Sequence, residues 1–442
     1  MKQSILSVAA LLLLSLIATS RVKAQDGMQV GAKVITKYKT PLRVGNQVVD
    51  SGSQFQVYKV ERVDGDWLWL VSGASSGWVA SSQVVPYHQA LDYYTQQIQI
   101  DPSVANKAHA YVCRGAIHAE KGQNDAALAD DTEALKLSPK YVSALNNRGA
   151  LWLDKGKQDT AIADLTEALR LNPKYVAAFY NRALAWTQNK EYVRAVSDLS
   201  EALRLNPNLV NAYYQRGNAL LMTGKYDEAI ADFDMFIKTN PSSPKAFANR
   251  ASAWRCKSRY FKAVTDFTEA IRLDPKEDIY LYKRGMCSLE SGDDDHAIDD
   301  FTEVVRREIK GGKIVAGLAR GTAWGHKRDY QKAIDDFTEV TRLNPNDPTA
   351  YNNLAFIRAT CPDARFRDGP KALAFAKKVC EGASTENDTF LSTLGAAYAE
   401  LGDFPKAIES QEKANKLLTS EREKQDGEER LEFYKNRRPY RG

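Results

Sequence analysis

A small residue that recurs at a regular interval of about 34 residues constrains this sequence more than any other feature, because such a period is typical of helical hairpins arranged in an array. The interval is constant from Gly115 to Gly285, and three further markers follow at slightly less regular distances. The markers are Gly115, Gly149, Ala183, Gly217, Ala251, Gly285, Gly321, Ala355 and Gly395. An alanine follows each of the first seven markers at one constant offset, from Ala127 to Ala333.

Each unit predicts two amphipathic helices that cross where the small residues lie, because small side chains let helix backbones approach closely. Glycine in a turn such as "DKGKQD" ends the first helix, and a proline near the end of most units stops the second. A single hairpin cannot cover its own apolar face. The hairpins are therefore expected to stack into an α-solenoid.

These offsets resemble the tetratricopeptide repeat (TPR), with the small marker at position 8 of each unit. The resemblance covers residues 108–418 as about nine repeats, of which the last two diverge. It implies a mainly α fold, a superhelix of helical hairpins. Residues 88–107 then form a half-repeat cap and linker, and residues 419–442 form a C-terminal capping helix and a basic tail. The main departures are Asp131, where an aromatic residue is expected, and the irregular end of the sixth unit.

A charge recurs inside the apolar stripe of the first helix. An arginine directly precedes each of the first seven markers, and an aspartate follows each arginine at one constant offset. The residues are Arg114, Arg148, Arg182, Arg216, Arg250, Arg284 and Arg320, with Asp130, Asp164, Asp198, Asp232, Asp266, Asp300 and Asp336. Because buried charge is tolerated only when paired, the pattern predicts a structural ladder of ion pairs, within a repeat or between neighbours. A row of cations that binds an acidic partner is the alternative.

The TPR resemblance also implies a peptide-binding groove lined by first-helix positions 2, 5, 9, 12 and 13. The groove candidates are Asn146, Tyr180, Asn211, Tyr214, Asn218, Tyr282, Met286, Asn352 and Phe356. Tyrosine rings with amide side chains suit an extended peptide or protein segment. The lysine and arginine set that clamps a C-terminal carboxylate in other members is absent, which argues against that ligand. The alternative is that the tyrosines only pack against neighbouring repeats.

Residues 28–87 have a different pattern, in which short β-branched and aromatic runs alternate with Gly, Asp and Ser turns. This pattern predicts a small all-β barrel. "DWLWLV" and "GWVASSQVV" resemble a bacterial SH3-like domain, which implies contact with peptide or cell-wall material. Tyr58, Trp67, Trp69 and Trp78 are the candidates for such a surface. Core packing is the alternative for at least half of them.

Two motifs could suggest chemistry. "GASSG" at residues 73–77 matches a nucleophile elbow, but two predicted strands flank it, so we interpret it and its Ser75 as a hairpin turn. His296 lies among acids in "GDDDHAIDD" at a predicted helix start, without metal-ligand spacing. The other histidines form no evident cluster with cysteine or serine. We expect no enzymatic activity, no cofactor and no metal site.

The five cysteines form no closely spaced framework, and we expect them to be free and mostly buried as small apolar residues. In particular, Cys361 and Cys380 fall at opposite ends of a predicted hairpin, too far apart for a disulfide.

The segment 1–24 resembles a secretory signal peptide. Lys2 precedes an apolar run from Ile5 to Ala18, and Val22 and Ala24 are small residues at the cleavage positions. We expect cleavage near Ala24 and an extracytoplasmic location, periplasmic or secreted; a retained anchor is the alternative. The apolar run is shorter than the ~20 residues of a membrane span. Removing the segment takes three basic residues from a chain with 61 basic and 56 acidic residues, and this near-neutral balance argues against nucleic acid as a partner.

Together these features predict a non-catalytic exported scaffold that binds a protein or peptide partner in the TPR groove. The SH3-like module would add contact with peptide or cell-wall material. The alternative is an accessory or regulatory subunit of an envelope enzyme, such as a wall hydrolase or a sugar transferase. A catalytic domain within the chain is disfavoured because the two modules use nearly all of its length.

Overall fold

The computed structural model describes residues 28–51, 55–73, 75–307, 311–382 and 387–442. The predicted signal segment, residues 1–24, lies outside the described residues. The chain divides into two compact units, residues 1–223 and residues 224–442.

Unit 1 begins with a curled antiparallel sheet of seven strands in the order β3-β2-β6-β5-β4-β1-β7. The strands are β1 (Lys33–Thr36), β2 (Leu42–Val44), β3 (Gln47–Asp50), β4 (Val57–Asp64), β5 (Trp67–Ser72), β6 (Ser75–Ala80) and β7 (Val84–Pro86). The register places Val34 opposite Tyr58 and Trp69 opposite Trp78. The all-β module predicted from the sequence is thus a curled sheet.

Alternation along the strands builds the core of this sheet. In β5 the side chains of Leu68 and Leu70 are buried, whereas Trp67 between the turn and Leu68 is exposed. Tyr58 and Val60 of β4 pack into the same cluster from the neighbouring strand. Successive side chains of a strand point to opposite faces, so one face of the sheet becomes apolar.

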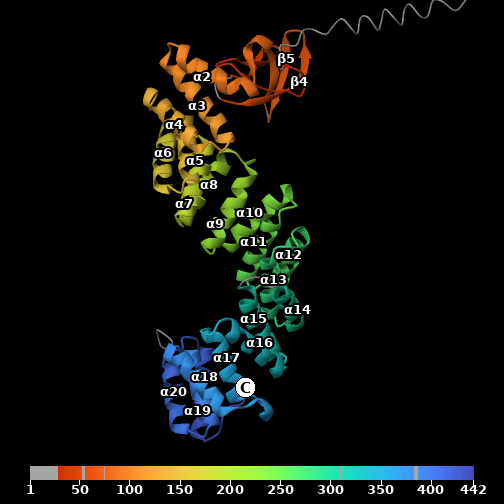
Figure 1. The fold of residues 1–442 in the computed structure, drawn as a ribbon, viewed down its shortest axis with the longest axis vertical. Coiled ribbons are helices and arrows are strands. Elements are labelled where there is room, and N and C mark those ends of the chain that lie inside the picture. Colours follow the sequence, from red (N-terminus) through yellow and green to blue (C-terminus); the bar gives the residue numbers. More distant parts are fainter. Residues whose placement is uncertain (1–27, 52–54, 74, 308–310, 383–386) are drawn as a thin grey trace, which may run out of the picture. The chain divides into compact units, whose positions relative to one another are not determined.

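The rest of unit 1 consists of helices joined as antiparallel hairpins (Figure 1). The helical elements are the 3₁₀ turns η1 (Ser81–Gln83) and η2 (Tyr87–Gln89), followed by α2 (Ala90–Ile100), α3 (Val104–Glu120), α4 (Asn124–Leu137), α5 (Val142–Asp154), α6 (Gln158–Leu171), α7 (Val176–Gln188), α8 (Tyr192–Leu205) and α9 (Val210–Met222).

The sheet packs against the first helices of unit 1. Ile35 of β1 and Val85 of β7 share a buried cluster with Tyr94 of α2 and Cys113 of α3. The apolar clusters of the sheet and of the first helices therefore meet within a single compact unit.

Unit 2 continues the same pattern of helical hairpins (Figure 1). Its elements are α10 (Tyr226–Thr239), α11 (Pro244–Cys256), α12 (Tyr260–Leu273), α13 (Asp278–Glu290), α14 (Asp294–Arg306), α15 (Gly312–His326), α16 (Tyr330–Leu343), α17 (Pro348–Thr360), the 3₁₀ turn η3 (Ala364–Phe366), α18 (Gly369–Gly382), α19 (Asp388–Glu400), α20 (Phe404–Leu417) and α21 (Glu421–Lys435).

The hairpin turns use left-handed backbone, as the glycine pattern predicts. Gly156, two residues after the end of α5, has φ +67°, and Gly292, two residues after the end of α13, has φ +83°. Glycine adopts this conformation without a Cβ clash, which suits it to end a helix. Two turns in which glycine is missing place Lys190 and Ser258 in the same conformation, with φ 62° and 55°.

The small markers lie where the two helices of a hairpin cross. A Cβ atom on Gly149 would lie 2.7 Å from Cγ of Leu165, and one on Gly321 would lie 2.7 Å from Cε1 of Phe337. These distances are shorter than van der Waals contact. The large apolar side chain of the second helix thus packs directly on the backbone of the first.

First helices of successive hairpins also contact one another. In unit 1, α3 contacts α5, α5 contacts α7, and α7 contacts α9; in unit 2, α13 contacts α15 and α17 contacts α19. The first helices α3, α5, α7 and α9 therefore form one continuous surface in unit 1, and α13 with α15 and α17 with α19 form two stretches of the same kind in unit 2. We call this side of the hairpins the first-helix face.

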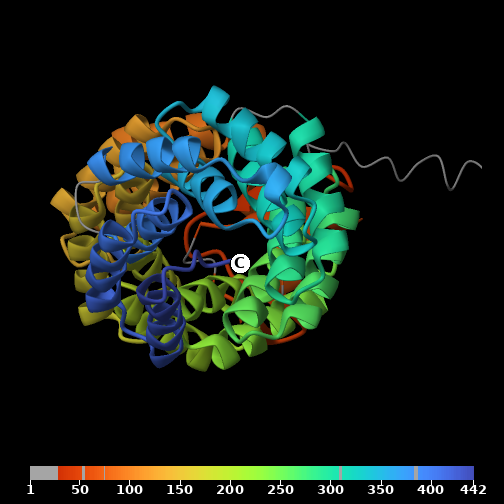
Figure 2. The same ribbon diagram turned by 90° about the horizontal axis from the view of Figure 1, so that it is seen from below.

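The end of the chain, marked C in Figure 2, contacts the first helices α17 and α19 of unit 2. The backbone N–H of Gly442 donates to the carbonyl oxygen of Thr360 at the end of α17, at 3.2 Å. Arg441 forms an ion pair with Glu400 of α19 at 2.6 Å. The basic tail predicted from the sequence is thus held against α17 and α19.

All five cysteines are free. Cys113, Cys287 and Cys361 are buried, as expected for small apolar residues. Cys380, which was expected to be buried, is half-buried, and Cys256 at the end of α11 is exposed. Among the described helices, none combines the length and the apolar character needed to cross a membrane.

Two phenylalanines of α12 test the packing of the hairpins. Phe267 is fully buried, whereas Phe261 is 85% exposed on the same helix. Phe267→Ala should lower the free energy of unfolding by about 3–5 kcal/mol, because it removes a ring from a closed core. Phe261→Ala should change it by less than about 0.5 kcal/mol. Urea unfolding followed by circular dichroism measures both, and equal effects would contradict this packing.

Candidate functional site

The recurring arginine forms a two-pronged ion pair inside its own hairpin. In the α7–α8 hairpin, Nε of Arg182 donates to Oδ2 of Asp198 at 2.8 Å, and Nη2 donates to Oδ1 at 2.8 Å. The Asp198 side chain is only 8% exposed. Such parallel hydrogen bonds from a planar guanidinium are among the stronger polar contacts in proteins. They neutralise a carboxylate at the helix crossing.

The same geometry recurs in the other described pairs, with donor–acceptor distances from 2.6 to 2.9 Å. These pairs are Arg114–Asp130, Arg148–Asp164, Arg250–Asp266, Arg284–Asp300 and Arg320–Asp336. The two remaining residues of the predicted ladder, Arg216 and Asp232, lie in different units. Their pairing stays a prediction.

The third nitrogen of the guanidinium reaches the preceding hairpin. Nη1 of Arg182 donates to Oγ1 of Thr166 on α6 at 3.1 Å, and Nη1 of Arg284 donates to Thr268 on α12 at 3.0 Å. Arg250 bonds Asp234 of α10 in the same way at 2.5 Å. Each of these arginines therefore joins three helices, so the ladder runs within and between hairpins. The sequence carried a signal for this contact, a Thr, Ser or Asp two positions after each ladder aspartate.

The ladder predicts unequal effects for two arginines of unit 1. Arg182→Ala should lower the free energy of unfolding by about 3–5 kcal/mol, because it leaves a buried carboxylate without its cation. Arg170 forms an exposed pair with Glu167, its own side chain being 64% exposed. Arg170→Ala should therefore leave the unfolding midpoint essentially unchanged. Thermal melts of both variants make the comparison, and an unchanged melt for Arg182→Ala would show that the ladder is not structural.

The groove candidates of unit 1 lie on the first-helix face with different exposures. Asn146 is only 7% exposed, and its Oδ1 accepts a hydrogen bond from Nδ2 of Asn181 in the next hairpin at 3.0 Å. Tyr180 is half-buried and hydrogen-bonds Gln215, again one hairpin along. Position 5 of one hairpin is thus bonded to position 6 of the next. Position 6, which Asn181 and Gln215 occupy, is not among the groove positions that the TPR resemblance implies.

Three further candidates lie nearby in unit 1. Tyr214 and Asn218 are half-buried on α9, and Asn211 is exposed at the start of that helix. The ring of Tyr180 packs with Trp186 and Tyr213 against a buried cluster of α7, α8 and α9. Tyr180 therefore packs against the neighbouring repeat and is also partly exposed. These are the features expected of a packing residue and of a groove residue, respectively.

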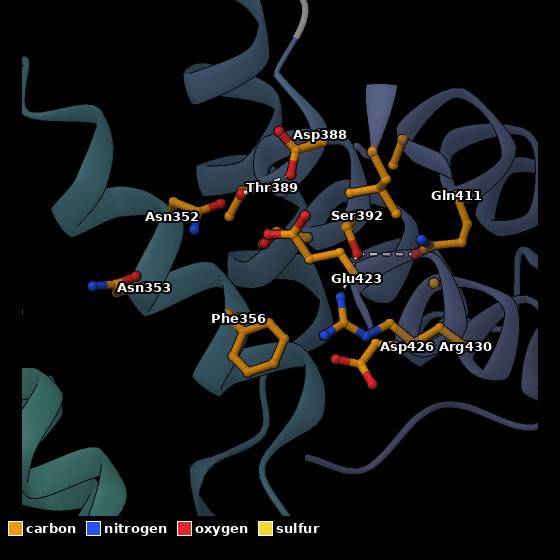
Figure 3. Close-up of a pocket in the computed structure, with 14 residues that line it drawn as sticks. Asn352, Asn353, Phe356, Asp388, Thr389, Ser392, Gln411, Glu423, Asp426 and Arg430 are labelled. Atoms are coloured by element: carbon orange, nitrogen blue, oxygen red, sulfur yellow. Dashed lines mark hydrogen bonds between the residues drawn. The ribbon is translucent and has the colours of Figure 1, made fainter. Parts of the chain in front are cut away.

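In unit 2 the candidates fall into two separate groups. Tyr282 and Met286 pack against a core cluster formed by α13, α14 and α15, and the ring centroids of Tyr282 and Phe301 lie 5.8 Å apart. Asn352 and Phe356 of α17 instead line a cavity of about 310 Å³. Figure 3 shows both residues on one wall of this cavity.

Helix α21 and the tail cover part of the first-helix face in unit 2. The guanidinium of Arg430 lies 6.0 Å from the ring centroid of Phe356 and 5.2 Å from that of Tyr440. Tyr434 of the same helix is fully buried. The two candidates on α17 thus lie beneath side chains from the end of the chain, an arrangement that the repeat pattern does not indicate.

Comparisons with known proteins agree with this architecture. Sequence models of the tetratricopeptide repeat match residues 153–210 and residues 199–231. Over residues 153–231 the chain carries tetratricopeptide repeats. A search of curated proteins found no significant match.

Several solved TPR structures resemble parts of the chain. YrrB, described as a TPR protein with an unusual peptide-binding site, is 23% identical, with 44% of this chain and 98% of YrrB covered and a TM-score of 0.40. MamA from Desulfovibrio magneticus RS-1 is 24% identical, with 38% and 97% covered and a TM-score of 0.37. The C-terminal part of a TPR protein from Cytophaga hutchinsonii is 17% identical, with 54% and 98% covered and a TM-score of 0.47.

The first TPR contains a contact between histidine and cysteine that corrects the sequence analysis. Nε2 of His109 lies 3.2 Å from Sγ of Cys113, and Nδ1 lies 3.0 Å from the hydroxyl oxygen of Tyr141. The sequence did carry a signal for this contact, because His109 and Cys113 are spaced one helical turn apart. The ring of Tyr38, from the sheet module, stacks on His109 at 4.0 Å.

This pair does not have the properties of a catalytic dyad. Cys113 is fully buried, and burial raises the pKa of its thiol to about 12. Burial also lowers the pKa of His109 to about 4. Because the thiolate is the nucleophilic form, a protonated and inaccessible thiol is inert at neutral pH. The stacking of Tyr38 on His109 joins the sheet module to the first repeat.

Asp131 takes the place of the large apolar residue in the first TPR. Its side chain is 1% exposed, and its Oδ1 has no hydrogen-bond partner among the described residues. Burial and the neighbouring Asp130 raise the pKa of Asp131 to about 8, while Arg148 opposes the shift. The buried carboxyl is therefore a destabilising feature of this repeat.

Replacing Asp131 should stabilise unit 1. In the next repeat Leu165 faces Gly149 at the equivalent position, so leucine fits opposite Gly115. Asp131→Leu should raise the free energy of unfolding by about 1–3 kcal/mol at pH 5, since it removes an unpaired buried polar group. The gain should be larger at pH 8, because a carboxyl whose folded-state pKa lies above its unfolded value destabilises the fold increasingly as pH rises between the two values. Urea unfolding of the variant and the unmodified chain at both pH values measures this gain. A gain in unfolding free energy that becomes smaller as pH rises would contradict the raised pKa of Asp131.

The aromatic residues of the sheet module differ in exposure. Tyr58 is 1% exposed, and its hydroxyl donates to Asp50 at 2.7 Å, so it belongs to the core. Trp69 and Trp78 are half-buried cross-strand neighbours with ring centroids 5.4 Å apart. Trp67 is 51% exposed. Trp67 is therefore the ring most accessible to a ligand among these four candidates.

The remaining motifs lie at a β-hairpin and at a helix cap, and Ser75, interpreted from the sequence as part of the turn, is the first residue of β6. β5 and β6 pair as a hairpin around the "GASSG" motif, and Gly73 has φ +57°. Ser75 lies opposite Ser72 in that pairing. His296 is exposed in the first turn of α14, and its backbone N–H donates to the capping carboxylate of Asp293. Among the described residues, no cluster of three or more His, Cys, Asp or Glu side chains could hold a metal ion.

Proposed function

We propose that this protein is a non-catalytic, exported scaffold that holds an extended protein or peptide segment on the first-helix face of its TPRs. The observation that carries the proposal is the character of that face in unit 1. Half-buried tyrosines and asparagine amides lie there on successive first helices, at Tyr180, Tyr214 and Asn218. Rings supply contact area, and amides can bond the backbone of an extended chain.

The arginine ladder argues against a partner that is recognised by its negative charge. Six of the ladder arginines are hydrogen-bonded to an aspartate of their own repeat, so these cations are already neutralised. A ligand recognised mainly through its negative charge is therefore disfavoured. The proposed partner binds through apolar contact and backbone hydrogen bonds.

Export and the sheet module complete the proposal. The expectation of export rests on the charged start, apolar run and small residues of positions 1–24, which lie outside the described residues. The curled sheet is proposed to act as an SH3-like module, with the exposed Trp67 as its contact to peptide or cell-wall material.

Capture of partners by the full-length mature chain tests this function. We expect Tyr180→Ala combined with Tyr214→Ala to weaken capture of specific proteins from an envelope fraction by about tenfold or more, since two contact rings are lost. Capture is quantified by mass spectrometry. Helical content should stay unchanged by circular dichroism.

The matched control is Tyr180→Phe with Tyr214→Phe, which keeps both rings and should retain most of the capture. A second comparison uses Trp67→Ala in the sheet module. If the alanine pair captures the same proteins as the unmodified chain, and capture depends on Trp67 instead, the first-helix face is not the binding site.

A further inference from the structure

The cavity in unit 2 has features that the TPR pattern alone does not supply. It lies among α17, α19, α20 and α21 and has a volume of about 310 Å³. Figure 3 shows Asn352 and Phe356 on the side of α17, with Arg430 and Asp426 of α21 facing them. The cavity is at the small end of ligand sites, a size that suits one long side chain or a small molecule.

A buried acceptor without a partner lies on the α17 wall. Asn352 is 6% exposed, and its Oδ1 lacks a hydrogen-bond partner among the described residues. Buried amide oxygens are nearly always hydrogen-bonded, because leaving one unpaired costs free energy. A donor group that enters the cavity would satisfy this oxygen.

The charge of the lining favours a cation. Three carboxylates line the cavity, from Asp388, Glu423 and Asp426, against one guanidinium from Arg430. Nη1 of Arg430 is engaged, because it donates to Oγ of Ser392 at 2.6 Å. Negative charge thus remains in excess around the opening.

Arg430 also offers a buried donor, its Nε, that no described residue accepts from. An acceptor such as a backbone carbonyl oxygen would satisfy it. The cavity therefore presents an acceptor and carboxylates for a cation, and a donor for a carbonyl group close to them.

We propose that this cavity binds the ammonium group of a lysine side chain in an extended partner segment. The ammonium donates to Oδ1 of Asn352 and to the carboxylates of Asp388 and Glu423, which lie toward the same end of the cavity (Figure 3), and the aliphatic stem contacts Phe356 and Leu418. A backbone carbonyl of the same segment accepts from Nε of Arg430. This inference rests on the proposed function for its source of lysine; a free diamine carries the same ammonium chemistry without the carbonyl.

Calorimetric titration of the full-length mature chain tests the proposal. The probe is an acetylated, amidated Gly-Ser-Lys-Ser-Gly peptide, compared with the same peptide containing norleucine and with 1,5-diaminopentane. We expect the lysine peptide to bind at least about tenfold more tightly than the norleucine peptide, because only lysine supplies the charge-assisted hydrogen bonds. The diamine should bind more weakly than the lysine peptide, since it has no carbonyl for Arg430.

Variants locate the binding in the cavity. Asp388→Asn with Glu423→Gln should weaken binding of the lysine peptide by about tenfold, and Asn352→Leu should also weaken it, because each removes a proposed ammonium partner. Glu428→Gln is the matched control, because Glu428 is exposed on α21 and does not line the cavity. Circular dichroism and unfolding midpoints verify that each variant is folded.

The outcomes separate the alternatives. Equal affinity for the norleucine peptide, or no binding of any probe at millimolar concentration, overturns the cation site. Diamine binding as tight as the lysine peptide supports the cation site and identifies a free amine as its occupant. Both proposals are supported if the cavity variants lose peptide binding and partner capture still depends on Tyr180 and Tyr214. If partner capture does not depend on those tyrosines, the proposed function alone is overturned.

Discussion

The structure depends on one constraint, the need to neutralise a carboxylate buried at the helix crossing of each regular hairpin. Asp198 shows how this is met, since Arg182 supplies two parallel hydrogen bonds from the facing helix. A bidentate pair fixes both the distance and the orientation of the two helices. The third guanidinium nitrogen then bonds Thr166 of the preceding repeat, so the same residue also sets the stacking. Pairing inside a hairpin and stacking between hairpins are thus coupled through one side chain.

This constraint shapes what the first-helix face can bind. Because the arginines are engaged by aspartates, the groups left at the face of unit 1 are rings and amides, and some of these are bonded between repeats, as in Asn146 with Asn181. In unit 2, α21 adds carboxylates and a guanidinium over Asn352 and Phe356. The two units therefore offer different chemistry on corresponding helices.

Contacts at a constant offset could be predicted from the sequence, and contacts made by irregular segments could not. The offset that brings Arg284 and Asp300 together is the same in each regular hairpin, so repetition carries the information. The stacking of Tyr38 on His109 depends on how the sheet docks against α3, which no periodic pattern encodes. The bond from Arg441 to Ala359 joins positions far apart in the chain and arises from the path of the tail. For the same reason the cavity that Asn352 faces could not be foreseen, because α21 closes it.

A double-mutant cycle at Arg284 and Asp300 tests the central claim most directly. The free energy of unfolding is measured by urea titration for Arg284→Ala, Asp300→Ala, the double variant and the unmodified chain. The ladder predicts a coupling energy of at least about 1.5 kcal/mol, as for hydrogen bonds between charged groups in a partly buried setting. A coupling below about 0.5 kcal/mol would place the pair among exposed ion pairs and contradict its role in holding the repeats together.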